Sequence, residues 1–64
     1  MSNITKNLRK LRESKGFSQE KLARLSDVSY NSIIKLETGG ITNPTIETLQ
    51  KIAKALEVQV DDLI

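Results

Sequence analysis

The segment YNSIIK, residues 30–35, carries four side chains that could recognise another molecule. Tyr30 offers a hydroxyl-bearing ring, Asn31 an amide, Ile34 methyl groups and Lys35 an ammonium. These groups bind by hydrogen bonds and apolar contact. The chain has no Cys and no His, which excludes the usual disulfide, zinc, thiol and imidazole chemistries. The residue types therefore predict binding, without catalytic residues, a metal or a cofactor.

Asp61 and Asp62 are the only adjacent pair of carboxylates. On a helix their side chains would diverge by about 100°, and no base, nucleophile or metal site accompanies them. The 64 residues make one domain, which we place at 1–64, near the lower size limit for a core that folds unaided. Such a domain has little room for an active-site cavity or a small-molecule site, and we expect a protein that is not an enzyme.

The charge is distributed unevenly along the chain. Residues 1–35 carry eight Lys/Arg against three acids, a net charge of +5, whereas residues 36–64 carry two Lys against five acids, a net charge of −3. A basic half predicts a surface that faces a polyanion, although an ordinary solvated surface would give the same count.

Nothing in the first ten residues, MSNITKNLRK, resembles a signal peptide. No apolar run approaches the length of a membrane span. Because the absence of Cys also fits a reducing compartment, we expect a cytoplasmic protein with no membrane partner.

Capping residues and apolar spacing predict four helices. The first follows a cap at Ser2 or Asn3 and ends near Gly16, which can adopt a left-handed conformation. Ser18 and Ser29 each precede an apolar-periodic run and should cap the second and third helices.

Short turns and loops should separate these helices. Asp27 is expected to take a left-handed conformation in the turn between helices two and three. Helix three should run over residues 30–38, and Thr45 should cap helix four. A short helix is expected to begin near Val60. The predicted core face of helix four contains Ile46, Leu49, Ile52, Ala53 and Leu56.

Helical spacing divides helix three into two faces. Ile33 and Leu36 centre the buried face, so that Asn31 and Lys35 point to the opposite side and Ile34 lies about 130° from the core centre. An amide can bond to adenine, an ammonium to guanine and a methyl-rich side chain can cover a thymine methyl in the major groove. Alternatively, Ile34 is an ordinary exposed apolar side chain.

The chain from Leu8 onward resembles the lambda-repressor-like helix-turn-helix family, also called Cro/repressor or XRE. The motifs that carry the resemblance are LRESKGFSQEKLA, VSYNSIIKLETG, NPTIETLQKIAKAL and VQVDDLI. The resemblance implies an all-α fold, a compact five-helix bundle with a helix-turn-helix at about residues 18–38. It also implies that the protein binds double-stranded DNA as a homodimer, on inverted repeats, with helix three as the recognition helix.

The resemblance also assigns roles to individual residues. Gln19, at the start of helix two, falls at a phosphate contact, which agrees with the favourable field of a helix N-terminus for an anion; its alternative role is capping. Arg12 and Glu37 match an internal ion pair that holds helix three. The expected DNA-binding residues are Gln19, Ser29, Tyr30, Asn31, Ser32, Ile34, Lys35, Thr42 and Asn43.

Two functions remain open at this point. The first is a sequence-specific transcriptional regulator of repressor or controller type, and the alternative is an antitoxin or other protein-interaction module built on the same domain. The dimer surface is not evident from the sequence. Its candidates, which could equally belong to the core, are Val58, Val60, Leu63 and Ile64. Asp27 and Glu57 stand where the family often has Gly, so each should carry strain on the order of 1 kcal/mol if its backbone is left-handed.

Overall fold

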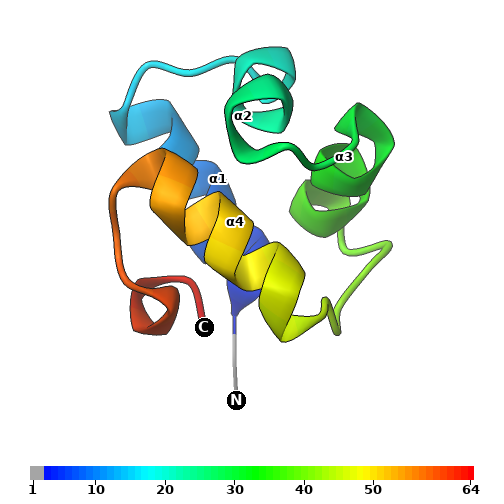
Figure 1. Cartoon of the computed structure of the whole chain (residues 1–64). Helices are drawn as coiled ribbons and strands as arrows, with labels where there is room; N and C mark the ends of the chain where they lie inside the picture. The colour runs from blue at the N-terminus through cyan, green and yellow to red at the C-terminus, as the bar shows by residue number, and fades with distance from the viewer. Residues whose placement is uncertain (1–2) are drawn as a thin grey trace.

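The computed structural model describes residues 3–64, which fold into four α-helices and one turn of 3-10 helix (Figure 1). The α-helices are α1 (Ile4–Ser14), α2 (Gln19–Ser26), α3 (Tyr30–Thr38) and α4 (Ile46–Leu56), and the 3-10 turn is η1 (Val60–Asp62). No strand occurs in this part of the chain. The all-α prediction is therefore confirmed, but the expected five-helix bundle is wrong, because the fifth segment forms a 3-10 turn of only three residues.

Three of the helices begin at a capping hydroxyl, as predicted. Ser18, Ser29 and Thr45 have extended backbones, and each side-chain oxygen accepts a hydrogen bond from the backbone N–H three residues later. This bond satisfies one of the amides that a helix N-terminus leaves without a partner. Helix α1 differs, because Asn3 occupies its N-cap position without a side-chain capping bond; the alternative cap, Ser2, lies outside the described residues.

The helix ends use left-handed backbone conformations. Gly16 and Gly39 have φ of 74° and 88°, and Asp27 and Glu57 have φ of 58° and 59°. The left-handed conformation predicted for Asp27 is confirmed, and Glu57 shares it. Since residues with a Cβ rarely adopt this backbone conformation, Asp27 and Glu57 carry backbone strain.

The core is built from apolar faces of all four helices and is closed by the C-terminal turn. Helix α3 packs against α1 and α2, α2 also packs against α4, and α4 contacts η1. The prediction for helix four is wrong at Ile46, which is 63% exposed in the first turn of α4. The buried apolar residues are Ile4, Leu8, Leu22, Ala23, Ile33, Leu36, Leu49, Ile52, Ala53, Leu56 and Leu63.

The C-terminal turn is part of this core. Leu63 is fully buried, and the amide nitrogen of Asn7 in α1 donates to its carbonyl at 3.1 Å. Val58 and Val60 pack against the core, whereas Ile64 is half exposed. Leu63 therefore has a core role and is not available as a dimer contact. In the described residues no helix is long and apolar enough to cross a membrane.

Candidate nucleic-acid interface

The sharp turn between α2 and α3 sets the angle between these two helices. Left-handed Asp27 ends α2, and the next amide, of Val28, donates back to the carbonyl of Ala23 at 3.1 Å. Val28 then packs against the core, and Ser29 starts α3 immediately after it. The two helices are thus joined by a three-residue connection, as in a helix-turn-helix.

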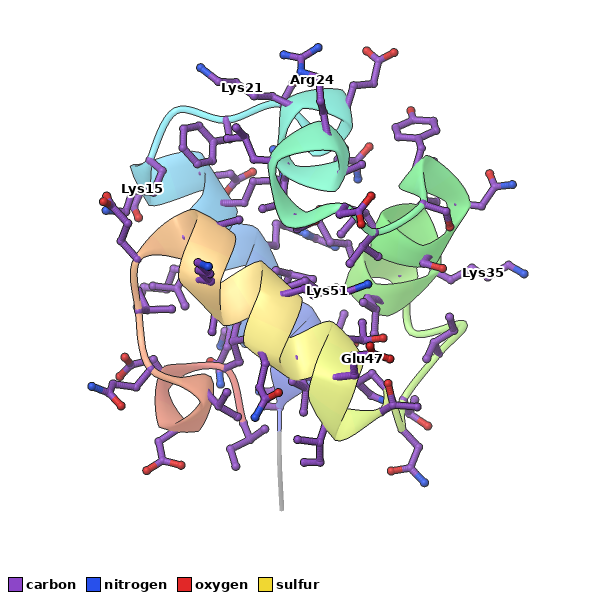
Figure 2. The ribbon with its side chains drawn as sticks, viewed as in Figure 1. Lys15, Lys21, Arg24, Lys35, Glu47 and Lys51 are labelled. Carbon is purple, nitrogen blue, oxygen red and sulfur yellow. The ribbon has the colours of Figure 1, made fainter. Side chains whose placement is uncertain are left out.

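One face of α3 is buried and the other is open to solvent. Ile33 and Leu36 are fully buried, while Asn31 and Lys35 are exposed. Figure 2 shows Lys35 extending away from the body of the domain. The faces predicted by helical spacing are therefore present, and they leave an amide and an ammonium free to meet another molecule.

Two further apolar or aromatic side chains lie on this helix outside the core. Tyr30, in the first turn, is 44% exposed. Ile34 is half-buried, so it is less open than a position on the outermost face of the helix would be. Both retain surface that a partner could cover.

The two serines at the start of α3 bond to each other. The hydroxyl of Ser29 accepts from the backbone N–H of Ser32 at 3.1 Å and donates to the Ser32 hydroxyl at 2.8 Å. This arrangement uses the proton of Ser29 and leaves the proton of Ser32 free to donate outward. Of the two, Ser32 is therefore the better donor to a phosphate.

The loop after α3 carries two more of the predicted DNA-binding residues, Thr42 and Asn43. The backbone N–H of Ile41 donates to the carbonyl of Lys35 at 3.1 Å, and the Ile41 side chain packs on the core. Thr42 and Asn43 are exposed. A surface hollow of about 240 Å³, lined among others by Ser32 and Asn43, separates α3 from the start of α4. Asn43 and Ser32 therefore lie on the lining of one hollow, whereas Thr42 is not among its lining residues.

Some basic side chains of the first half of the chain extend into solvent, and others bond to Glu37. Lys21 and Arg24 of α2 extend into solvent (Figure 2). Arg9 and Arg12 of α1 instead bond to Glu37 of α3. Arg12 is therefore partly buried, whereas exposed basic side chains occur on α1 (Lys6, Arg9 and Lys10) as well as on α2 and α3.

Glu37 is the centre of a buried polar network. Its side chain is 2% exposed, and its Oε2 accepts from Arg12 Nε at 2.6 Å while its Oε1 accepts from Arg12 Nη2 at 3.0 Å. Arg12 Nη1 also donates to the carbonyl of Phe17 at 2.7 Å. Such a bidentate pair is a strong, geometrically specific hydrogen-bonding arrangement. The bond to Glu37 raises the pKa of Arg12 above its ordinary value, against a lowering by burial.

Two more side chains reach Glu37. Arg9 Nη2 donates to its backbone carbonyl at 3.0 Å, and Gln19 Nε2 donates to its carboxylate Oε1 at 3.1 Å. Neither contact was predicted from the sequence. The spacing of Arg9 and Arg12, three residues apart on one face of a helix, is a signal that could have indicated the first of them.

A family model described as helix-turn-helix matches residues 8–63. The chain belongs to the helix-turn-helix family. The resemblance to the XRE type is thereby confirmed. The match covers every residue of α2, α3 and α4 together with the Arg12 and Glu37 pair.

Curated relatives are named as transcriptional regulators. The chain is 38% identical over 60 residues to the HTH-type transcriptional regulator SlrR of Bacillus subtilis (strain 168), covering 94% of this chain and 40% of SlrR. It is 31% identical over 61 residues to SinR of the same organism, covering 95% of this chain and 55% of SinR. The helix-turn-helix chain thus spans about half the length of these relatives.

Two solved structures share the fold. The restriction-modification controller protein C.AhdI from Aeromonas hydrophila superposes with a TM-score of 0.89 at 34% identity, covering 95% of this chain and 91% of that one. SinR, the master regulator for biofilm formation, was solved in complex with DNA and superposes with a TM-score of 0.91 at 32% identity, covering 94% and 95%. The helix-turn-helix arrangement described above is therefore shared with a protein seen on DNA.

Proposed function

We propose that this domain binds double-stranded DNA sequence-specifically and serves as the DNA-reading part of a transcriptional regulator of repressor or controller type. The observation that carries the proposal is the two-sided construction of α3. Ile33, Leu36 and Glu37 fix the helix to the domain, while Asn31 and Lys35 are open to solvent. The relatives named as transcriptional regulators and the fold shared with DNA-bound SinR support it.

In this proposal α3 lies in the major groove. Asn31 bonds to adenine N6 and N7, Lys35 donates to guanine O6 and N7, and Ile34 covers a thymine methyl. These three side chains select the sequence, because base edges carry the sequence information that phosphates lack.

Phosphate contacts flank the reading helix on both sides. Ser29, Tyr30 and Ser32 stand at or next to the N-terminus of α3, where the helix dipole favours an anion. Thr42 and Asn43 serve the same purpose from the loop before α4, and Gln19 does so from the start of α2. Ser29 contributes mainly by capping, since its hydroxyl proton is already directed to Ser32.

The domain, residues 1–64, is proposed to act as a homodimer on an inverted repeat in the cytoplasm. A single α3 of nine residues reaches only one short stretch of the groove. Two copies related by a two-fold axis would read half-sites about 34 Å apart, one turn of DNA. Ile64 is the dimer candidate with the most exposed surface.

Selection of bound duplexes from a random DNA pool tests the proposal. We expect one enriched inverted repeat whose affinity falls steeply with salt, because each phosphate contact releases counterions. Lys35→Ala should relax the preference at one base pair in each half-site, at a cost of about 1 to 3 kcal/mol.

Lys54→Ala is the matched control. It removes the same charge from the last turn of α4, at the end of that helix away from α3 (Figure 1), and should leave the base preference unchanged. Enrichment of no duplex, or binding insensitive to salt, would contradict the proposal. Co-purification with a second polypeptide would then favour the protein-interaction alternative.

A further inference from the structure

Glu37 joins three helices through donors that come from different parts of the chain. Arg12 of α1 holds its carboxylate, Arg9 of α1 holds its backbone carbonyl and Gln19 of α2 holds carboxylate Oε1. Among residues 3–64, the Gln19 bond is the only side-chain hydrogen bond between α2 and α3. The two helices of the helix-turn-helix are thus linked by the Asp27 turn, by apolar packing and by this one polar contact.

The Gln19 amide has a second N–H that none of the hydrogen bonds within residues 3–64 uses. Gln19 is the first residue of α2, half-buried, and it stands beside the backbone amides at the start of that helix. An amide nitrogen carries two hydrogens that point in different directions. One can therefore remain on Glu37 while the other donates to a phosphate oxygen at the helix N-terminus.

We propose that Gln19 is a positioning residue for base selection, which holds Glu37, and with it α3, at the angle that α3 needs in the major groove. A phosphate bound to the second N–H would keep the amide nitrogen oriented toward Glu37. Phosphate binding and the position of the side chains that contact the bases would then be coupled through the Gln19 amide. This inference rests on the proposed DNA-binding function.

The geometry separates this role from that of Arg12. Without Gln19, Arg12 still holds Glu37 through two hydrogen bonds, at 2.6 and 3.0 Å. The domain should therefore stay folded, with α3 attached to α1 but less constrained relative to α2. An ordinary phosphate contact would strengthen binding to every duplex equally, whereas a positioning residue strengthens binding to the operator more than to other sequences.

Gln19→Met tests the difference, because Met keeps the length and the helix propensity of Gln and removes only the amide. Dissociation constants are measured at one salt concentration for the selected operator and for an unrelated duplex of equal length. We expect the ratio of the two constants to narrow by about tenfold, the size of one lost hydrogen bond to a charged group. Thermal unfolding of each variant confirms that it is folded.

Lys21→Met is the matched control in the same helix. Lys21 is exposed and its ammonium lies over the Phe17 ring, with no bond to α3, so its loss should leave the ratio of the two dissociation constants unchanged, because any contribution of its charge to phosphate binding is the same for both duplexes. If Gln19→Met does not fold, Gln19→Asn takes its place, since its amide is one methylene too short to reach Glu37.

An equal loss on both duplexes would make Gln19 a plain phosphate contact and overturn the inference. An unchanged affinity for both would overturn it as well. Failure of the unmodified protein to prefer any duplex is a separate outcome, because it would contradict the proposed function before Gln19 is tested.

Discussion

Replacing Arg12 by Met should destabilise the domain severely. The substitution removes the two hydrogen bonds that Arg12 donates to Glu37 and leaves a carboxylate that is 2% exposed with Gln19 as its remaining side-chain donor. Removing one partner of a buried ion pair costs about 3 to 5 kcal/mol, since the other charge stays buried without compensation. The side chain of Arg12 is 13% exposed, so solvent screens this pair only weakly.

The size of the domain makes this loss decisive. At about 0.05 to 0.15 kcal/mol per residue, 64 residues correspond to a free energy of unfolding of roughly 3 to 10 kcal/mol. For a domain of this size a loss of 1 kcal/mol lowers Tm by about 4 to 8 °C. Arg12→Met is therefore expected to lower Tm by at least about 12 °C, and in the less stable part of this range the variant would be largely unfolded at 25 °C.

Urea unfolding followed by circular dichroism, at several temperatures, measures the loss. The double variant Arg12→Met with Glu37→Met provides the control, because it removes the buried charge together with its partner. Replacing both members of a buried pair by apolar residues of similar volume is often neutral. We therefore expect the double variant to regain at least half of the lost free energy. A loss below 1 kcal/mol for Arg12→Met would refute the reasoning and make the pair a surface feature.

Three further predictions concern the ends and the outer face of the helices. Glu57→Gly should raise the free energy of unfolding, measured by thermal melts, by about 1 kcal/mol, because it relieves the strain of a left-handed backbone. Asp27→Gly should raise it by less, because Asp tolerates that conformation better than Glu does. A lower free energy of unfolding for either variant would contradict this account of strain. Ser29→Ala removes the hydroxyl that accepts from the Ser32 amide and should cost about 1 kcal/mol; an unchanged urea midpoint would show that α3 does not need the cap. Ile34→Ser should weaken the preference for thymine at one position of the selected duplexes by about 1 kcal/mol. It should lower the free energy of unfolding by less than that, because Ile34 lies outside the core. An unchanged thymine preference would make Ile34 an ordinary surface residue.

The sequence predicted the local features of the fold well. The caps at Ser18, Ser29 and Thr45, the left-handed Asp27 and the bounds of α3 agree with the structure. Each of these depends on a hydrogen bond or a backbone preference that spans only a few residues, so the residue types themselves carry the information. The apolar spacing of helix four wrongly predicted that Ile46 is buried. A residue at the first position of a helix can follow that spacing and still lie beyond the edge of the packed face.

The packing of the final segment was not evident from the sequence. The residues after Val60 have a helical start signal, but Leu63 is fully buried and Asn7 fixes its carbonyl. No local pattern encodes that contact between residues 56 positions apart. The five-helix expectation failed because Val60–Asp62 form a 3-10 turn instead of an α-helix.

The residue types and their spacing by themselves predicted which residues face outward on α3 and which are buried, and they favoured binding over catalysis. Only the tertiary structure decided how the buried charges are arranged. Arg9 and Gln19 reach Glu37 from 28 and 18 residues away, and a polar side chain of either type could equally have pointed into solvent. Such contacts depend on the angles and distances between packed helices, which arise from the core as a whole, and so they become visible only when α1, α2 and α3 are placed together.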